Sequence, residues 1–92
     1  MTLKKDGEML KDLYSQLIKI ETEEECAKFL GDLCTVKELE SMAQRLQAAK
    51  MLLDGRTYQE ITAQTDISSA TLARVSKCVR YGDGGYESII KK

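Results

Sequence analysis

Three Thr-x-x-Glu pairs most constrain how this chain of 92 residues can fold. The pairs are Thr22 with Glu25, Thr35 with Glu38, and Thr57 with Glu60. In such a capping box the threonine hydroxyl accepts a hydrogen bond from the backbone N–H of the glutamate. The glutamate carboxylate in turn accepts one from the backbone N–H of the threonine. Each pair therefore predicts the start of a helix. Because proline is absent, nothing in the composition interrupts these helices, and the pattern predicts an all-α fold.

About six helices with short connections account for the chain. Apolar residues at helical spacing predict a first helix over residues 4–20, and Thr22 opens a second. A long helix follows over roughly 36–54, and Gly55 is suited to end it. A last short helix is expected from 86 to about 91. The buried side of the long helix is expected to carry Leu39, Met42, Ala43, Leu46, Ala49, Leu52 and Leu53.

We expect a single domain over 1–92 with four parts, because a chain of this length forms one modest core. The parts are N-terminal dimerisation helices (4–34), a long core helix (35–55), a helix-turn-helix (57–80) and a C-terminal loop with a short helix (82–92). The first two helices have more apolar surface than a small core can absorb, which favours a homodimer. The alternative is that they fold back on their own chain as a bundle.

The segment 57–80 has the pattern of two short helices joined by a tight turn. Asp66 lies at the turn, and aspartate tolerates the left-handed backbone conformation that such a turn uses. Ser68 is placed to cap the second helix. Apolar residues then lie where the two crossing helices must bury side chains against each other. These residues are Ile61, Ile67, Leu72 and Val75.

The second of these helices, about 69–80, has outward residues that are small or cationic, as in a helix that enters the major groove of DNA. Arg74 is the strongest candidate for DNA contact, because its guanidinium suits a guanine edge or a phosphate. Ser69, Ala70 and Thr71 are small enough to approach base edges. Lys77 is expected at a phosphate, while for Arg80 a phosphate contact and a solvated position are equally favoured.

The charge distribution weakens the DNA prediction without excluding it. The net charge is -1 and the isoelectric point is near 5.5. Residues 1–55 hold 8 basic and 11 acidic side chains, whereas residues 56–92 hold 6 basic and 4 acidic ones. A modestly positive C-terminal part suffices if each subunit contacts few phosphates and a dimer doubles them.

No catalytic or metal site is expected. Histidine is absent, so neither a histidine base nor a histidine ligand is available, and there is no glycine-rich phosphate loop. Cys26, Cys34 and Cys78 lack metal-ligand spacing, and we expect three buried, reduced thiols. No cofactor is expected either. With no signal peptide and no membrane span, the sequence predicts a cytoplasmic protein.

From Leu33 to Val79 the chain resembles the Trp repressor family, and most closely its YerC/YecD-type branch. The shared residues are Thr35 at a helix start, Arg45 ten residues on, the Leu52-Leu53-x-Gly55 helix ending, and Ser69-Ala70-Thr71-Leu72-Ala73-Arg74. The match covers about half of the chain. The resemblance implies an intertwined all-α homodimer with helix-turn-helix reading heads. It also implies that Gln59 and Thr62 occupy positions where the family touches the DNA backbone. Ser68 is a further candidate for DNA contact besides its capping role, and Ser69 can also meet the backbone.

In the family, the arginines matching Arg45 and Arg74 help to hold the corepressor tryptophan, so these two residues are candidates for binding a small-molecule effector. Val75 stands where the repressor has glycine, and Cys78 stands where it has a serine that helps to bind the ligand. Added volume and a lost polar partner both disfavour tryptophan. The favoured role for both arginines is instead to pair with carboxylates or contact phosphate.

The favoured function is a homodimeric, sequence-specific regulator of transcription, acting on double-stranded DNA as a repressor by occlusion. The alternative is a helical protein-interaction module that does not bind DNA, which the acidic isoelectric point favours. Oxidation of Cys78, near the end of the recognition helix, is a further hypothesis for regulation.

Overall fold

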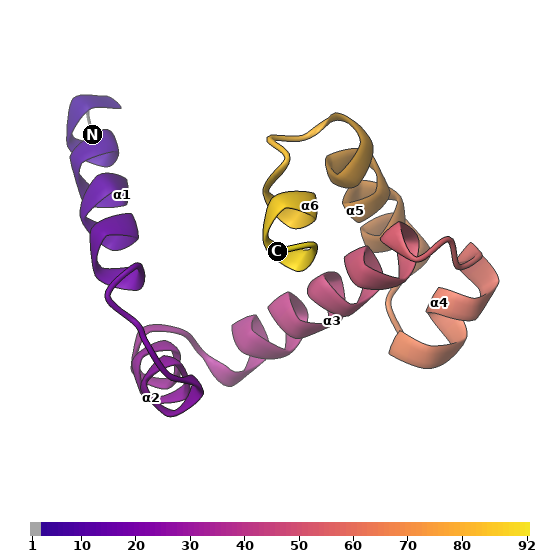
Figure 1. Ribbon diagram of the computed structural model, residues 1–92, viewed down its shortest axis with the longest axis horizontal. Coiled ribbons are helices and arrows are strands. Elements are labelled where there is room, and N and C mark those ends of the chain that lie inside the picture. Colours follow the sequence, from indigo (N-terminus) through magenta and orange to yellow (C-terminus); the bar gives the residue numbers. More distant parts are fainter. Residues whose placement is uncertain (1–2) are drawn as a thin grey trace. The chain divides into compact units, whose positions relative to one another are not determined.

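The computed structural model describes residues 3–92, and their side chains from residue 7 on. The described residues form six helices joined by short connections and contain no strand (Figure 1), so the all-α prediction is confirmed. The helices are α1 (Leu3–Leu17), α2 (Glu23–Leu33), α3 (Val36–Leu53), α4 (Tyr58–Thr65), α5 (Ser69–Tyr81) and α6 (Gly85–Ile90). The first helix ends three residues earlier than its apolar pattern predicts, and residues 18–20 form a turn instead.

The chain divides into two compact units, Met1–Thr35 and Val36–Lys92. In the first unit, the hydroxyl of Thr22 accepts a hydrogen bond of 3.1 Å from the N–H of Glu25 and so caps α2. The Glu25 carboxylate accepts from the N–H of Glu21 at 2.9 Å, one residue before the expected partner. No side chain of residues 7–35 is fully buried. This unit therefore has no core of its own among its described side chains.

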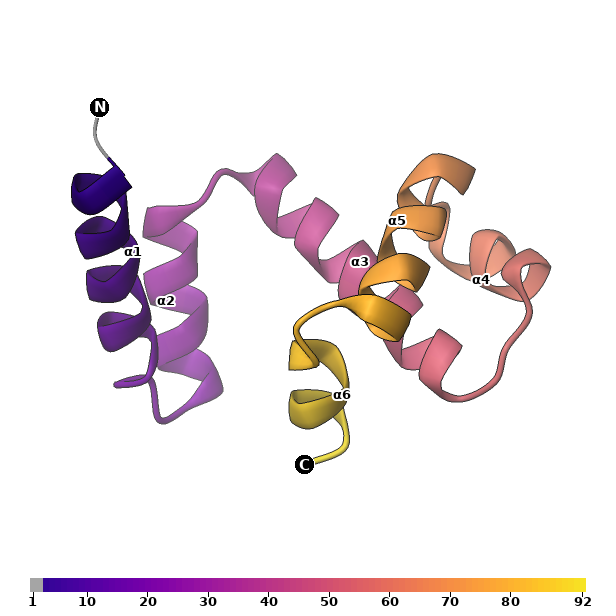
Figure 2. The ribbon, with the colours of Figure 1, turned by 90° about the horizontal axis from the view of Figure 1, so that it is seen from above.

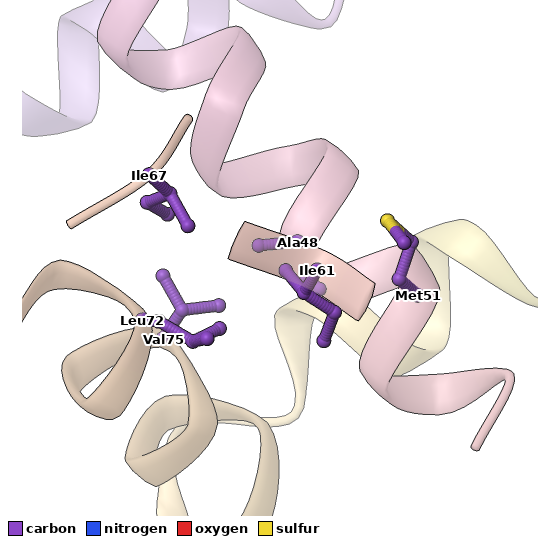
Figure 3. Close-up of a cluster of buried hydrophobic side chains, with 7 residues drawn as sticks. Ala48, Met51, Ile61, Ile67, Leu72 and Val75 are labelled. Carbon is purple, nitrogen blue, oxygen red and sulfur yellow. The ribbon is translucent and has the colours of Figure 1, made fainter. Parts of the chain in front are cut away.

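The second unit is built around the C-terminal half of α3. Helices α4, α5 and α6 all contact α3 and gather there in both views of the ribbon (Figures 1 and 2). Ala48 and Ala49 are fully buried, and their small side chains let the neighbouring helices approach the α3 backbone closely. Figure 3 shows Leu72 and Val75 of α5 directed toward Ile61 of α4. The complete core cluster is Ala48, Ala49, Met51, Ile61, Ile67, Leu72 and Val75.

The N-terminal half of α3 is not covered within its own unit. Met42, Ala43 and Leu46 were expected on the buried side of the helix, but all three are exposed. Leu39 and Leu52 are half-buried, and Ala49 is buried as expected. The difference arises because α4, α5 and α6 cover only the other half of α3, so helical spacing identified an apolar face but not what covers it.

The end of α3 is held by a glycine cap that leads directly into α4. Gly55 adopts φ 83°, a left-handed conformation that glycine takes without steric cost. The N–H of Arg56 donates to the carbonyl of Met51, and the N–H of Gly55 donates to that of Leu52. This is the Schellman arrangement, which satisfies carbonyls that the helix end would otherwise leave unpaired. The predicted role of Gly55 is confirmed.

The cysteines are less buried than expected. Cys26 and Cys34 are half-buried, and Cys78 is exposed, so the prediction of three buried thiols is wrong. Cys78 lies outside the core because Leu72, Val75 and Ser76 already fill the inward face of α5. Among residues 3–92, no helix is long and apolar enough to cross a membrane.

Candidate nucleic-acid interface

Helix α4 begins at a complete capping box. The Thr57 hydroxyl accepts from the N–H of Glu60 at 3.2 Å, while a carboxylate oxygen of Glu60 accepts from the Thr57 N–H at 3.1 Å and from its hydroxyl at 3.0 Å. Arg56 adds an ion pair of 3.5 Å to the other oxygen of Glu60. The Thr57 hydrogen bonds, followed by the charge of Arg56, lower the pKa of the Glu60 carboxyl below its usual 4.5. The start of α4 is therefore defined by its own residues.

The turn between α4 and α5 depends on Asp66. This residue has φ 59° and ψ 16°, and it is the non-glycine residue with positive φ among those described. Its N–H donates to the carbonyl of Thr62 and closes the last turn of α4. The Thr65 hydroxyl donates to the carbonyl of Ile61 at 2.7 Å. The predicted left-handed turn is confirmed, and it reverses the chain so that α4 and α5 bury Ile61, Leu72 and Val75 together.

Helix α5 is capped by Ser68. Its hydroxyl accepts a hydrogen bond of 3.1 Å from the N–H of Thr71 and donates one of 2.8 Å to the Thr71 hydroxyl. The predicted capping role is confirmed, and the two hydroxyls pair with each other at the helix start. Thr71 is half-buried rather than fully outward. Ser69 and Ala70, in contrast, are exposed in the first turn of α5.

Two exposed cations lie farther along the same helix. Arg74 and Lys77 are exposed, and among the described residues neither side chain makes an ion pair or a hydrogen bond. The alternative in which Arg74 pairs with a carboxylate therefore has no support in this unit. Arg80 is exposed as well. These guanidinium and ammonium groups are available to an anion outside the chain.

The outer side of α4 is uncharged at the two candidate positions. Gln59 is exposed, whereas Thr62 is half-buried and its hydroxyl donates to the Gln59 carbonyl at 3.1 Å. An amide and an internally bonded hydroxyl offer less to a phosphate than a lysine or arginine would. If α4 faces a DNA backbone, Gln59 and Thr62 add hydrogen bonds and no charge.

The two candidate effector arginines differ in their surroundings. Arg45 is half-buried on α3, and its Nε donates to the carbonyl of Ser41 at 3.4 Å, while Arg74 is exposed on α5. Val75 is 3 % exposed and is part of the core cluster, so its isopropyl group occupies space that glycine would leave open. Cys78 lines a mostly apolar groove of about 480 Å³ together with Leu46, Gly82, Asp83, Gly85, Tyr86, Ile89 and Ile90.

Comparison with known proteins decides the family. The family model described as Trp repressor protein matches residues 8–92, which extends the resemblance from half of the chain to nearly all of it. The chain belongs to the Trp repressor family. Within this family it is 41% identical over 86 residues to YerC of Bacillus subtilis strain 168, an uncharacterised protein. That match covers 94% of this chain and 83% of YerC, so the chain is of the YerC type.

Two solved structures from the Trp repressor family share the fold. One is a Staphylococcus aureus protein provisionally assigned as a Trp repressor, with a TM-score of 0.89 and 39% identity over 99% of this chain and 92% of the other. The second is a TrpR-like protein from Eubacterium eligens, with a TM-score of 0.87 and 33% identity over 91% and 87% of the two chains. The fold is thus shared by these two bacterial proteins and this chain.

Two residues near the candidate interface were not predicted from the sequence. The Gln44 side chain donates a hydrogen bond of 3.2 Å to the carbonyl of Thr65. The two residues are 21 positions apart, so no local sequence pattern predicts this bond. Tyr81, the last residue of α5, is 80% exposed. Its spacing of four and seven residues from Lys77 and Arg74 was a usable signal, because residues at that spacing share one side of a helix.

Proposed function

We propose that this protein is a homodimeric, sequence-specific DNA-binding regulator of transcription that acts in the cytoplasm. Helix α5, about residues 69–80, enters the major groove, and α4 lies across the DNA backbone. Ser69, Ala70 and Thr71 approach base edges, while Arg74 and Lys77 contact bases or phosphates. Gln59, Thr62 and Ser68 complete the contacts to the backbone. Bound at a promoter, such a dimer represses by excluding polymerase.

The main support for the proposal is that Arg74 and Lys77 are exposed and make no ion pair, on a helix whose opposite face is buried. Leu72, Val75 and Ser76 of α5 are buried against the rest of the unit. Some carboxylates of the described chain pair with other cations, as Glu60 does with Arg56. A protein that used these cations for its own stability would pair them, whereas a DNA-binding protein leaves them free for phosphate.

A second copy of the chain is the partner that the apolar surface supports. Residues 7–35 contain no buried side chain, although their helices carry exposed Met9, Leu10 and Leu33. The N-terminal half of α3 adds exposed Val36, Met42 and Leu46. Apolar area of this extent on a small chain is typical of an interface. A symmetric dimer would also present two α5 helices to two half-sites.

Binding to genomic DNA fragments at physiological salt tests the proposal. A subset of fragments should bind at least 10³-fold more tightly than bulk DNA, and the affinity should fall steeply as salt rises. Binding of every fragment no better than bulk DNA would overturn sequence-specific recognition.

Arg74→Ala should weaken specific binding by about 1–3 kcal/mol and leave the dimer intact. Lys91→Ala is the matched control, because Lys91 is an exposed lysine outside α4 and α5 that pairs with Glu87. It removes the same charge and should change specific binding little. If Arg74→Ala instead dissociates the dimer, the residue has a structural role.

A protein-interaction module without DNA binding is the second candidate. The uncharged side of α4 at Gln59 and Thr62 favours it, together with the isoelectric point near 5.5. An apolar protein interface should respond little to salt, whereas counterion release makes DNA binding strongly salt-dependent. Salt titration of any complex therefore separates the two candidates.

We further propose that tryptophan is not the effector. Val75 fills core volume, and Cys78 offers only a weak hydrogen-bond partner to an ammonium group. Millimolar tryptophan should leave DNA affinity unchanged, and a tenfold increase would contradict this. Arg45 and Arg74 stay candidates for a different effector.

A further inference from the structure

Tyr81 is an exposed aromatic residue with no role in the core. Its side chain is 80% exposed, whereas Val79 and Tyr86, on either side of it in sequence, pack against the buried cluster. The chain has few aromatic residues, with 4 tyrosines, 1 phenylalanine and no tryptophan. A large ring left in water at the end of a well-packed helix is therefore available for contact outside its unit.

The position of Tyr81 on α5 aligns it with the cations of the candidate interface. Ala70, Arg74, Lys77 and Tyr81 follow one another at intervals of four, three and four residues, which places them on one side of a helix. The opposite side is occupied by the buried Leu72, Val75 and Ser76. A surface that meets Arg74 and Lys77 would therefore extend to Tyr81.

The length of α5 determines which part of DNA Tyr81 could reach. From Ser69 to Tyr81 the helix rises by about 18 Å, at 1.5 Å per residue. The major groove is only about 12 Å wide. If α5 crosses the groove at a steep angle with its first turn at base edges, its last turn lies beyond the groove, beside the phosphate backbone. A phenolic hydroxyl is a good donor to a phosphate oxygen.

We propose that the Tyr81 hydroxyl donates a hydrogen bond to a DNA phosphate and helps to orient α5 in the groove. This inference rests on the DNA-binding function proposed above. The contact adds affinity for DNA without adding a charge. Residues 56–92 have an excess of only two positive charges, so an uncharged contact supplements a weak electrostatic attraction. It fixes the position of the helix on the backbone and is independent of base sequence.

Tyr81→Phe tests the contact, because it removes the hydroxyl and keeps the ring. Binding to a selected genomic site and to bulk duplex should weaken by about 2- to 10-fold alike, and the slope of log affinity against log salt should not change. Lys77→Ala should instead reduce that slope by about one. Tyr14→Phe, at a 58% exposed tyrosine of α1, is the matched control and should have no effect.

The outcomes separate this inference from the proposed function. If the unaltered protein binds DNA and Tyr81→Phe binds equally well, the hydroxyl contact is overturned and the function stands. If Tyr81→Phe shifts the dimer toward monomer in sedimentation, the residue belongs to a subunit interface and the contact is also overturned. If the unaltered protein binds no DNA, the proposed function fails and the contact fails with it.

Discussion

The side-chain amide of Gln44 on α3 donates a 3.2 Å hydrogen bond to the backbone carbonyl of Thr65, the last residue of α4. This bond ties the long helix to the residue that precedes the left-handed turn at Asp66. It acts at the one place where α4 and α5 change direction relative to each other. A residue outside residues 57–80 therefore helps to hold the turn between α4 and α5.

Gln44→Ala should lower the free energy of unfolding by about 0.5–1 kcal/mol, because the bond is exposed and such hydrogen bonds contribute modestly. Urea unfolding measures this. Gln47→Ala is the control. Gln47 is exposed about one turn further along α3, and its side chain makes no hydrogen bond among the described residues. Equal destabilisation by both variants would show that helix propensity, and not the bond to Thr65, is responsible.

Asp66→Val should destabilise the protein by about 1–2 kcal/mol, because a β-branched residue is strained at φ 59°. Asp66→Asn should cost much less, since asparagine also tolerates the left-handed region. Thermal unfolding of the two variants gives the comparison. If both are equally destabilised, the carboxylate matters rather than the backbone conformation.

Ile61 is fully buried between α3, α4 and α5. Truncation to valine should cost about 0.5–1.5 kcal/mol and truncation to alanine about 2–5 kcal/mol, because each leaves a larger cavity. Chemical denaturation of this series reports the graded loss. A cost for alanine no larger than that for valine would mean that the helices close around the site without loss.

Glu60 should make stability depend on pH in the acid range. The lowered pKa means that its contribution is fully present above the usual carboxyl value of 4.5 and is lost as pH falls through the lower value in the folded state. In Glu60→Gln this part of the pH dependence should be missing. Carboxyl titration by NMR supplies a direct check, and an ordinary pKa for Glu60 would contradict the capping box in solution.

Leu46→Lys should shift the proposed dimer toward monomer, because Leu46 lies on the exposed apolar half of α3, with 46% of its surface accessible. Placing a charge in an apolar interface is costly. Sedimentation equilibrium over a range of concentrations measures the change. The adjacent polar residue supplies the control, Gln47→Lys, which should leave assembly unchanged. A monomeric unaltered protein would refute the dimer itself.

Local signals in the sequence determined the helices and their ends. Thr57 and Glu60 define the start of α4 through contacts three residues apart, Ser68 caps α5, and Gly55 and Asp66 supply left-handed positions where the chain must turn. Each of these depends on neighbours within a few residues, so pattern alone is sufficient. Ile61, Leu72 and Val75 could also be expected in one cluster, because the turn at Asp66 brings together two helices that are adjacent in sequence.

Only the tertiary structure decided which apolar faces are covered and which long-range bonds form. Helical spacing predicts that Met42, Leu46 and Ala49 lie on the same side of α3. Only Ala49 is buried, because the other helices of its unit cover just the C-terminal half of α3. The Gln44–Thr65 bond and the exposure of Cys78 likewise depend on how whole helices pack. Sequence pattern specifies a helix and its apolar side, whereas burial requires a partner surface that is distant in the chain or belongs to another chain.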